Sequence, residues 1–239
     1  QDIQEKVLTS MREHNAAGLV LCPAFDTPPT LPDTIRSWGI PLVVTMRPLG
    51  EGDYDMVGCD NVAGMQAATR HLIECGHKRI AFVGRRRGSA VSEQRIAGYL
   101  NAMREASLPV SDDWVIDVPL NAAGGQQGVS IINTMDPQPT AVVCYNDSVA
   151  FGVLNELDTL GKRAGRDLAV VGFDDIAAAA HSSPPLTSVS VGPAQLGEMA
   201  SRILLSRING EGDADKAKKY LVTPKLVVRE SSGPMRVSP

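Results

Sequence analysis

Polar side chains that could contact a small ligand follow apolar runs in the second half of the chain. Ser89 and Arg95 come after one such run, Asn146 after the next, and the pair Asp174 and Asp175 after a third. Carboxylate and amide groups pair with hydroxyls, and a guanidinium pairs with a ring oxygen or a carboxylate. This set therefore suits the binding of a neutral polyol without any reaction.

The residues that catalysis would need are not arranged in a recognisable way. Ser89, Ser92 and Ser148 have no histidine within a plausible motif, and we expect the four histidines to lie at helix ends or on the surface. The nucleophile-elbow, Walker and dinucleotide-binding strings do not occur. The four cysteines are too far apart for a metal cluster. We therefore expect no enzymatic activity, no metal and no cofactor.

The elements that must position these polar residues alternate between strand and helix. Apolar runs that end abruptly in polar groups are typical of parallel strands buried on both faces. In an open α/β sheet, ligands bind at the carboxyl edge of the strands. The predicted strands are residues 18–22, 40–45, 55–59, 79–83, 114–118, 140–144 and 168–173, and the main helices are 1–14, 34–38, 61–75, 93–106, 125–134, 147–160 and 197–208.

The strands and helices fall into two groups on either side of about Gly76. We predict a first lobe of residues 1–76 plus about 192–221 and a second lobe of residues 77–191 plus about 222–239. Residues 184–191 are interpreted as a connector that leaves the sheet, and residues 220–229 as one strand with Pro224 at a bulge or edge. The first group has few units, so we expect a strand-helix-strand before Gln1.

Composition limits the class of protein. The chain has 239 residues, of which 43% are hydrophobic and 21% charged, as in ordinary globular proteins. Its net charge of −4 gives no bulk attraction to a nucleic-acid backbone. No apolar run is long enough to span a membrane. Cys22 and Cys144 lie in apolar runs, where a reduced cysteine acts as a small hydrophobe, so a reducing cytoplasm is expected.

Seven short strings occur in the order of one known family. They are DN at 60–61, HLxxxGHKRIA at 71–81, RxxG at 95–98, PTAVVCYND at 139–147, VVGFDD at 170–175, PLTSV at 185–189 and TPxLVVRES at 223–231. Together they resemble the effector-binding core of the lactose-repressor/galactose-repressor (LacI/GalR) family of bacterial transcriptional regulators. The resemblance covers residues 1–232.

The resemblance implies an α/β fold of the type I periplasmic-binding-protein kind. It has two doubly wound parallel-sheet lobes joined by three crossovers, here with the first lobe incomplete, and a small effector in the cleft. Family members bind operator DNA as homodimers through an N-terminal headpiece, which lies outside this sequence, so we expect a fragment. The cleft positions of the family match Arg95, Asn146, Asp174, Leu120, Val91 and Val191.

These expectations favour the effector-sensing domain of a LacI-type regulator, in which lobe closure around a sugar or related polar metabolite changes operator affinity. Leu120 and the two valines make the predicted cleft less polar and less aromatic than a typical sugar site. The main alternative is a solute-binding protein of a transport system, because one fold serves both functions. A signal peptide upstream would favour transport, and a helix-turn-helix would favour regulation. An enzyme is a third alternative.

Overall fold

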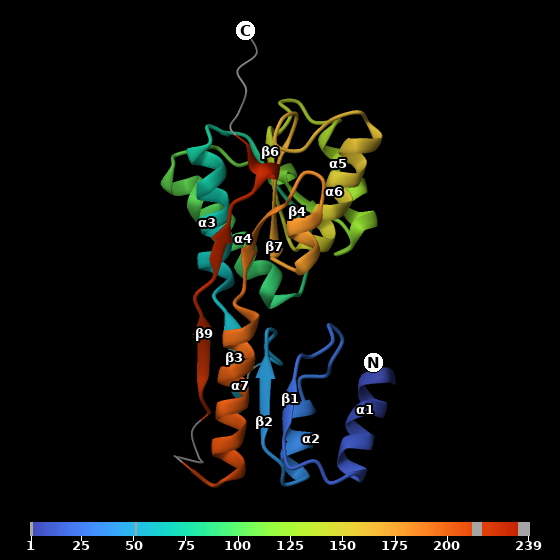
Figure 1. Ribbon diagram of the computed structural model, residues 1–239, viewed down its shortest axis with the longest axis vertical. Helices are drawn as coiled ribbons and strands as arrows, with labels where there is room; N and C mark the ends of the chain where they lie inside the picture. The colour runs from blue at the N-terminus through green and yellow to red at the C-terminus, as the bar shows by residue number, and fades with distance from the viewer. Residues whose placement is uncertain (1, 51, 212–216, 234–239) are drawn as a thin grey trace. The chain divides into compact units, whose positions relative to one another are not determined.

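The computed structural model describes residues 2–50, 52–211 and 217–233 (Figure 1). Its contacts divide the chain into two compact units. Unit 1 comprises Gln1–Cys59 and Gly192–Val222, and unit 2 comprises Asp60–Val191 and Thr223–Pro239. The chain therefore passes from one unit to the other three times. Each unit contains its own sheet and its own covering helices.

Unit 1 is built on a four-stranded parallel sheet with the order β1-β2-β3-β9. Helix α7 packs against β1, β2 and β3. Leu8 and Ile35, from two other helices, form a hydrophobic cluster with Leu19 of β1. The elements are α1 (Asp2–Glu13), β1 (Leu19–Leu21), α2 (Leu31–Ser37), β2 (Leu42–Thr45), β3 (Asp55–Cys59), α7 (Pro193–Ile208) and β9 (Lys219–Val222).

Unit 2 is built on a six-stranded sheet with the order β10-β8-β7-β6-β4-β5, in which only β10 is antiparallel to its neighbour. Helices α3 and α4 pair on one face, and α5 and α6 pair on the other (Figure 1). The elements are α3 (Asn61–Glu74), β4 (Ile80–Arg85), α4 (Ala90–Glu105), η1 (Asp112–Trp114), β5 (Val115–Asp117), α5 (Ala122–Ile132), β6 (Ala141–Cys144), α6 (Asp147–Thr159), β7 (Ala169–Asp174), η2 (Ala177–His181), β8 (Thr187–Ser190), β10 (Lys225–Val227) and η3 (Glu230–Ser232).

Local sequence signals account for the starts of the helices in unit 2. Asp60, Ser89, Asn121 and Asn146 each precede a helix, and each side chain accepts a hydrogen bond from the backbone N–H three residues later. These bonds satisfy donors that the first helical turn leaves unpaired. The predicted α/β class and the parallel pairing of most strands are confirmed.

Three expectations differ from the structure. Helix α3 belongs to unit 2 rather than to the first lobe, because it packs against α4, where Gly98 lets the backbone of Val62 approach closely. The predicted connector 184–191 is wrong, since it contains β8, which pairs in parallel with β7 inside the sheet. The predicted strand 220–229 is two strands in different sheets, because Pro224 interrupts the pairing.

Candidate ligand-binding site

Arg95 is the centre of a polar cluster at the carboxyl edge of the unit 2 sheet. It projects from α4, and its side chain is only 4% exposed. Its Nε donates to Asn61 Oδ1 at 3.0 Å, one terminal nitrogen donates to the carbonyl of Tyr145, and Nη2 lies 3.4 Å from Asp174 Oδ1. The guanidinium carbon also lies 3.7 Å from the centroid of the Phe173 ring. These contacts fix the guanidinium in one position.

Asp174 is the carboxylate that Arg95 holds at this edge. It is the last residue of β7, and its side chain is 31% exposed, so it reaches solvent while the guanidinium does not. Its backbone φ is +107°, and the next residue, Asp175, has a φ of +50°. Residues other than glycine rarely adopt these backbone angles, and such strain persists only where the surrounding structure imposes it. The turn therefore fixes the direction of the Asp174 carboxylate.

A second carboxylate, that of Asp147, holds this turn in place through hydrogen bonds. Asp147 is fully buried at the start of α6 and accepts hydrogen bonds from the Ile176 backbone N–H at 2.8 Å and the Ser188 hydroxyl at 2.5 Å. The Ser188 Oγ in turn accepts from the backbone N–H of Asp175 at 3.1 Å. Asp147 therefore anchors the backbone N–H of Ile176 directly and that of Asp175 through Ser188.

The pKa of Asp147 is raised to about 6, chiefly by burial and in addition by the nearby carboxylates of Asp174 and Asp175, while the two hydrogen bonds act in the opposite direction. Strand β7 must leave room for the Asp147 carboxylate. A Cβ atom at Gly172 would lie 2.2 Å from Asp147 Oδ1, so only glycine fits this position of β7.

Asp175, the other acid predicted at this edge, has a structural partner. Its Oδ1 lies 2.8 Å from Nη2 of Arg229, and both side chains are mostly buried. Arg229 Nη1 also donates to the carbonyl of Leu186 at 2.6 Å. The ion pair fastens the closing segment of the chain to the loop after β7. Asp174 and Asp175 therefore have different roles although they are adjacent.

The remaining predicted residues also lie in unit 2. Asn146 directly follows Tyr145, and its Oδ1 accepts from the Val149 backbone N–H at 2.9 Å, so one half of its amide is used as a helix cap. The Ser89 hydroxyl likewise caps α4. Val91 and Val191 are only 4% and 5% exposed. Leu120 packs over Gly84, where an added Cβ would meet its Cδ2 atom at 3.3 Å. The ligand contacts of these five side chains stay predictions.

Sequence reasoning missed two groups that build the cluster, Asn61 and the Phe173 ring, which were seen only as parts of short strings or as a helix start. Asp147 was recognised as a polar residue after a strand end, but its contacts were not predicted. Its partner Ile176 lies 29 residues away in the chain, and Arg95, the partner of Asn61, lies 34 residues away. No local pattern reports contacts of that kind.

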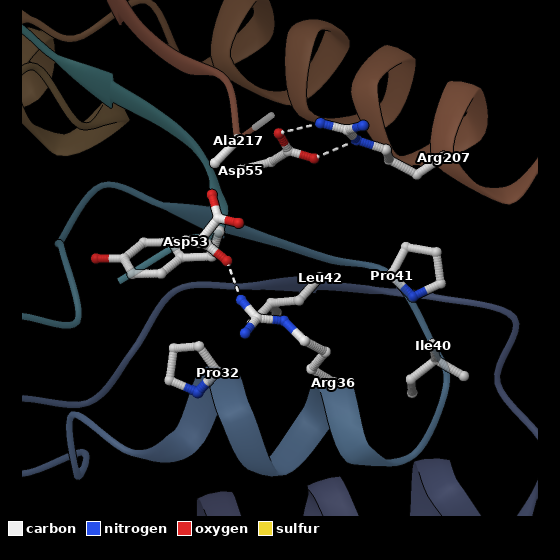
Figure 2. A pocket seen from close by; sticks show the side chains of 10 residues that line it. Pro32, Arg36, Ile40, Pro41, Leu42, Asp53, Asp55, Arg207 and Ala217 are labelled. Carbon is white, nitrogen blue, oxygen red and sulfur yellow. Dashed lines mark hydrogen bonds and ion pairs between the residues drawn. The ribbon is translucent and has the colours of Figure 1, made fainter. Parts of the chain in front are cut away.

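Unit 1 has a hollow at the amino edge of its sheet, and three of the charged side chains that line it, Arg36, Asp55 and Arg207, already have partners (Figure 2). Asp55 and Arg207 form a bidentate ion pair with N···O distances of 2.7 and 2.9 Å. Arg36 bonds to Asp33 at 3.1 Å and to the backbone carbonyl of Asp53. These contacts hold α2, β3 and α7 together. The hollow therefore has a structural explanation that does not require a ligand.

The described residues limit the chemistry of the chain further. No group of three His, Cys, Asp or Glu side chains among them is placed to hold a metal ion. No helix in the same residues has the length and apolar character to cross a membrane. The side chains around Arg95 and Asp174 are fixed in position and can form hydrogen bonds with a ligand. This arrangement suits ligand binding.

The chain is similar to a known domain family and to known proteins. Residues 69–232 match the family described as periplasmic binding protein-like domain. The HTH-type transcriptional repressor PurR of Haemophilus influenzae (strain PittEE) is 30% identical over 226 residues, which cover 94% of this chain and 63% of that protein. The chain therefore spans less than two thirds of the length of this relative.

Two solved structures are similar over nearly the whole chain. The transcriptional regulator CelR in complex with cellobiose has a TM-score of 0.84 at 30% identity, covering 95% of this chain and 69% of that chain. A regulator of the LacI family from Sanguibacter keddieii DSM 10542 has a TM-score of 0.80 at 31% identity, covering 95% of this chain and 82% of that chain. All three proteins are transcriptional regulators by name. This chain belongs to the LacI family, and it contains the periplasmic-binding-protein-like domain.

Proposed function

We propose that this chain senses a small effector for a LacI-type transcriptional regulator. The observation that carries the proposal is Asp174, a partly exposed carboxylate held in a strained turn by the buried Arg95 at the carboxyl edge of the unit 2 sheet. A carboxylate fixed in this way accepts hydrogen bonds from hydroxyl or ring N–H groups of a ligand without first losing rotational freedom. The effector class is a sugar or a related polar metabolite.

The effector acts by shifting a conformational equilibrium of the regulator. A ligand can shift such an equilibrium only by the difference between its affinities for the two states. Because Asp174 sits in a strained backbone, small changes in that turn change its distance from the ligand and hence the affinity. The proposed output is a changed affinity of the full-length protein for operator DNA.

The other parts of the proposal follow from the family. DNA is bound through a headpiece outside this sequence, the protein works as a homodimer in the cytoplasm, and the chain catalyses no reaction. Support comes from the name of PurR as an HTH-type repressor and from the cellobiose bound to CelR. In the proposed site, Arg95 and Asp174 are the core contacts, and Asn146, Leu120, Ser89, Val91 and Val191 are the further proposed contacts.

A thermal-shift screen tests the proposal. A ligand that binds only the folded protein raises its melting temperature, so sugars, sugar acids, nucleobases and polyols are compared at equal concentration. We expect at least one compound to raise the melting temperature of the wild type. Asp174→Ala should abolish that response while the circular dichroism spectrum stays native. Asp158→Ala is the matched control, because Asp158 is an exposed carboxylate on α6. A ligand response that survives in Asp174→Ala would contradict the assignment.

A further inference from the structure

Two stretches of unit 2 that the sensing site does not use meet beside the starts of strands β4 and β8. One connects α3 to β4 and carries His71 and His77, and the other is the closing segment, residues 223–233. His71 Nε2 lies 2.8 Å from Ser232 Oγ, and His77 Nε2 lies 3.2 Å from the carbonyl oxygen of Gly233. Two histidines therefore hold the end of the closing segment.

A chain of hydroxyl groups continues from His71 to the backbone of Arg229. Ser232 Oγ lies 2.7 Å from Thr187 Oγ1, which lies 3.1 Å from the Arg229 carbonyl oxygen. Each hydroxyl has one proton to donate, and the carbonyl only accepts. Thr187 therefore donates to the carbonyl, Ser232 donates to Thr187, and the ring of His71 donates to Ser232 through Nε2. His77 also donates through Nε2, because its partner is a carbonyl. Both rings form these bonds in their neutral state.

Arg229 joins the closing segment to the strained turn of the sensing site. Its backbone N–H donates to Thr187 Oγ1 at 2.8 Å, and its side chain forms the ion pair with Asp175, the neighbour of Asp174. Arg229 precedes η3, which packs against β7 and β8. Because the same short segment carries Arg229 and Ser232, release of its end loosens the hold on the turn.

The closing segment encloses the two rings that hold it. His77 is only 4% exposed, and His71 is partly buried. Burial is the largest influence and lowers the pKa of both rings from the ordinary value of 6.5. The hydrogen bonds to the closing segment and the Glu74 carboxylate act against it, whereas a charge on His71 lowers the pKa of His77 further. Both rings are therefore favoured in the neutral form while the segment covers them.

Other ionisable groups also lie around the two rings. Cys75 lies with its sulfur 3.6 Å from the Ser232 carbonyl oxygen, and burial and then Glu74 raise the pKa of its thiol, which stays protonated. The further charged neighbours are Glu74 on α3, Lys78 and Arg79 directly after His77, and Glu230 on the closing segment, which pairs with Arg163 at 3.7 Å. Imidazole is the side chain that ordinarily changes charge just below neutral pH.

We propose that His71 and His77 form a proton-sensitive clamp, which releases the closing segment in acid and thereby loosens the ion pair of Arg229 with Asp175. A segment that leaves uncovers both rings, and an uncovered imidazole binds a proton more tightly than a buried one. The attachment is therefore fully stable above pH 6.5 and weakens as the pH falls below that value. The clamp goes beyond the proposed sensing function, because it is defined without a ligand.

Hydrogen–deuterium exchange measures the release of the segment directly. The wild type and a double variant, His71→Gln with His77→Gln, are labelled at pH 7.5 and pH 5.5, with rates corrected for the intrinsic pH dependence of amide exchange. On going to pH 5.5, we expect the protection of residues 225–233 to fall by about threefold or more in the wild type relative to the variant. A glutamine amide donates a hydrogen bond but takes up no proton, so the variant should hold the segment at both pH values.

The same labelling tests the link to the sensing site. Residues 173–178 should also lose protection at pH 5.5 in the wild type relative to the double variant. Because this is a comparison at equal pH, the contribution of Asp147 to the pH dependence of the turn cancels. Arg229→Gln removes the ion pair at every pH, so it should expose residues 173–178 already at pH 7.5.

One control variant and two single variants complete the design. His14→Gln is the matched control, because His14 is exposed in unit 1 and its ring contacts the carbonyl of Ser10 on the preceding helix. It should lose protection in acid as the wild type does. The single variants His71→Gln and His77→Gln serve if the double variant fails to fold, and each should remove part of the response to acid.

The outcomes are distinct from those of the ligand screen. Protection of residues 225–233 that is equal at both pH values in the wild type overturns the clamp, as does an equal loss in the double variant. Release of the segment with residues 173–178 unchanged overturns the link to the turn of Asp174. None of these measurements contains a ligand, so a failure of the clamp leaves the sensing function standing, and a failure of the sensing function leaves the clamp standing.

Discussion

Replacing Asp147 by asparagine should make the free energy of unfolding of unit 2 less dependent on pH. The folded-state pKa of this buried carboxyl group is raised from 3.8 to about 6. A raised pKa means that the folded state binds the proton more tightly than the unfolded state does. The resulting stability is fully present below pH 3.8 and is lost as the pH rises to about 6. Ionised Asp147 therefore lowers the free energy of unfolding at neutral pH.

The magnitude follows from the size of the shift. A difference of about two pKa units corresponds to about 3 kcal/mol, of which about 2 kcal/mol falls between pH 4.5 and pH 7.5. The Asp147→Asn side chain cannot ionise, so this part of the pH dependence disappears. Its oxygen can still accept from the Ile176 N–H, but its NH₂ group replaces an acceptor opposite the Ser188 hydroxyl. That mismatch lowers stability by a similar amount at both pH values.

The assay measures urea unfolding of unit 2 by tryptophan fluorescence. The chain has two tryptophans, Trp38 in unit 1 and Trp114 in unit 2, so a Trp38→Phe background makes Trp114 the reporter of unit 2. From pH 4.5 to pH 7.5, we expect the wild type to lose about 2 kcal/mol relative to Asp147→Asn. Asp158→Asn controls for the loss of one negative charge from α6. A difference that does not change with pH, or that changes in the opposite direction, would refute the reasoning.

Three further predictions concern stability. Gly172→Ala should lower the free energy of unfolding by about 2–4 kcal/mol, because its methyl group would lie 2.2 Å from a buried carboxylate oxygen. Gly197→Ala, at a position on α7 with open space around it, should instead raise the free energy of unfolding by roughly 0.5–1 kcal/mol. Urea titrations measure both changes. Asp55→Asn should cost about 3–5 kcal/mol in unit 1, read from Trp38 fluorescence, because it removes the carboxylate that forms a bidentate ion pair with the largely buried guanidinium of Arg207. Burial lowers the pKa of His77, so wild-type stability should fall as the pH drops below the unfolded-state value of 6.5, and His77→Gln should reduce that loss in calorimetric melts.

The sequence was sufficient for the elements whose signals are local. Runs of apolar residues gave nearly all the strands of both sheets, because a strand buried on two faces must be apolar throughout. Helix caps such as Asp60 and Asn146 were also predictable, since a cap and its partner are three residues apart. The carboxyl edge of the second sheet, with Arg95 and Asp174, followed from those strand ends.

Contacts distant in sequence explain what could not be predicted. Residues 184–191 were interpreted as a connector that leaves the sheet, but Thr187 and Ser188 are fully buried in β8. Their hydroxyls donate to the carbonyl of Arg229 at 3.1 Å and to the carboxylate of Asp147 at 2.5 Å, which removes the cost of burying them. Nothing within a window of ten residues indicates these acceptors. The same holds for the helix pairing that assigns α3 to unit 2.

The pairing of charges decides which ligand chemistry the carboxyl edge of the unit 2 sheet leaves open. Arg95 bonds to Asp174 and Arg229 to Asp175, so both cations at that edge are neutralised within the protein. Such an edge discriminates by the direction of hydrogen bonds, and it suits hydroxyl or ring N–H groups.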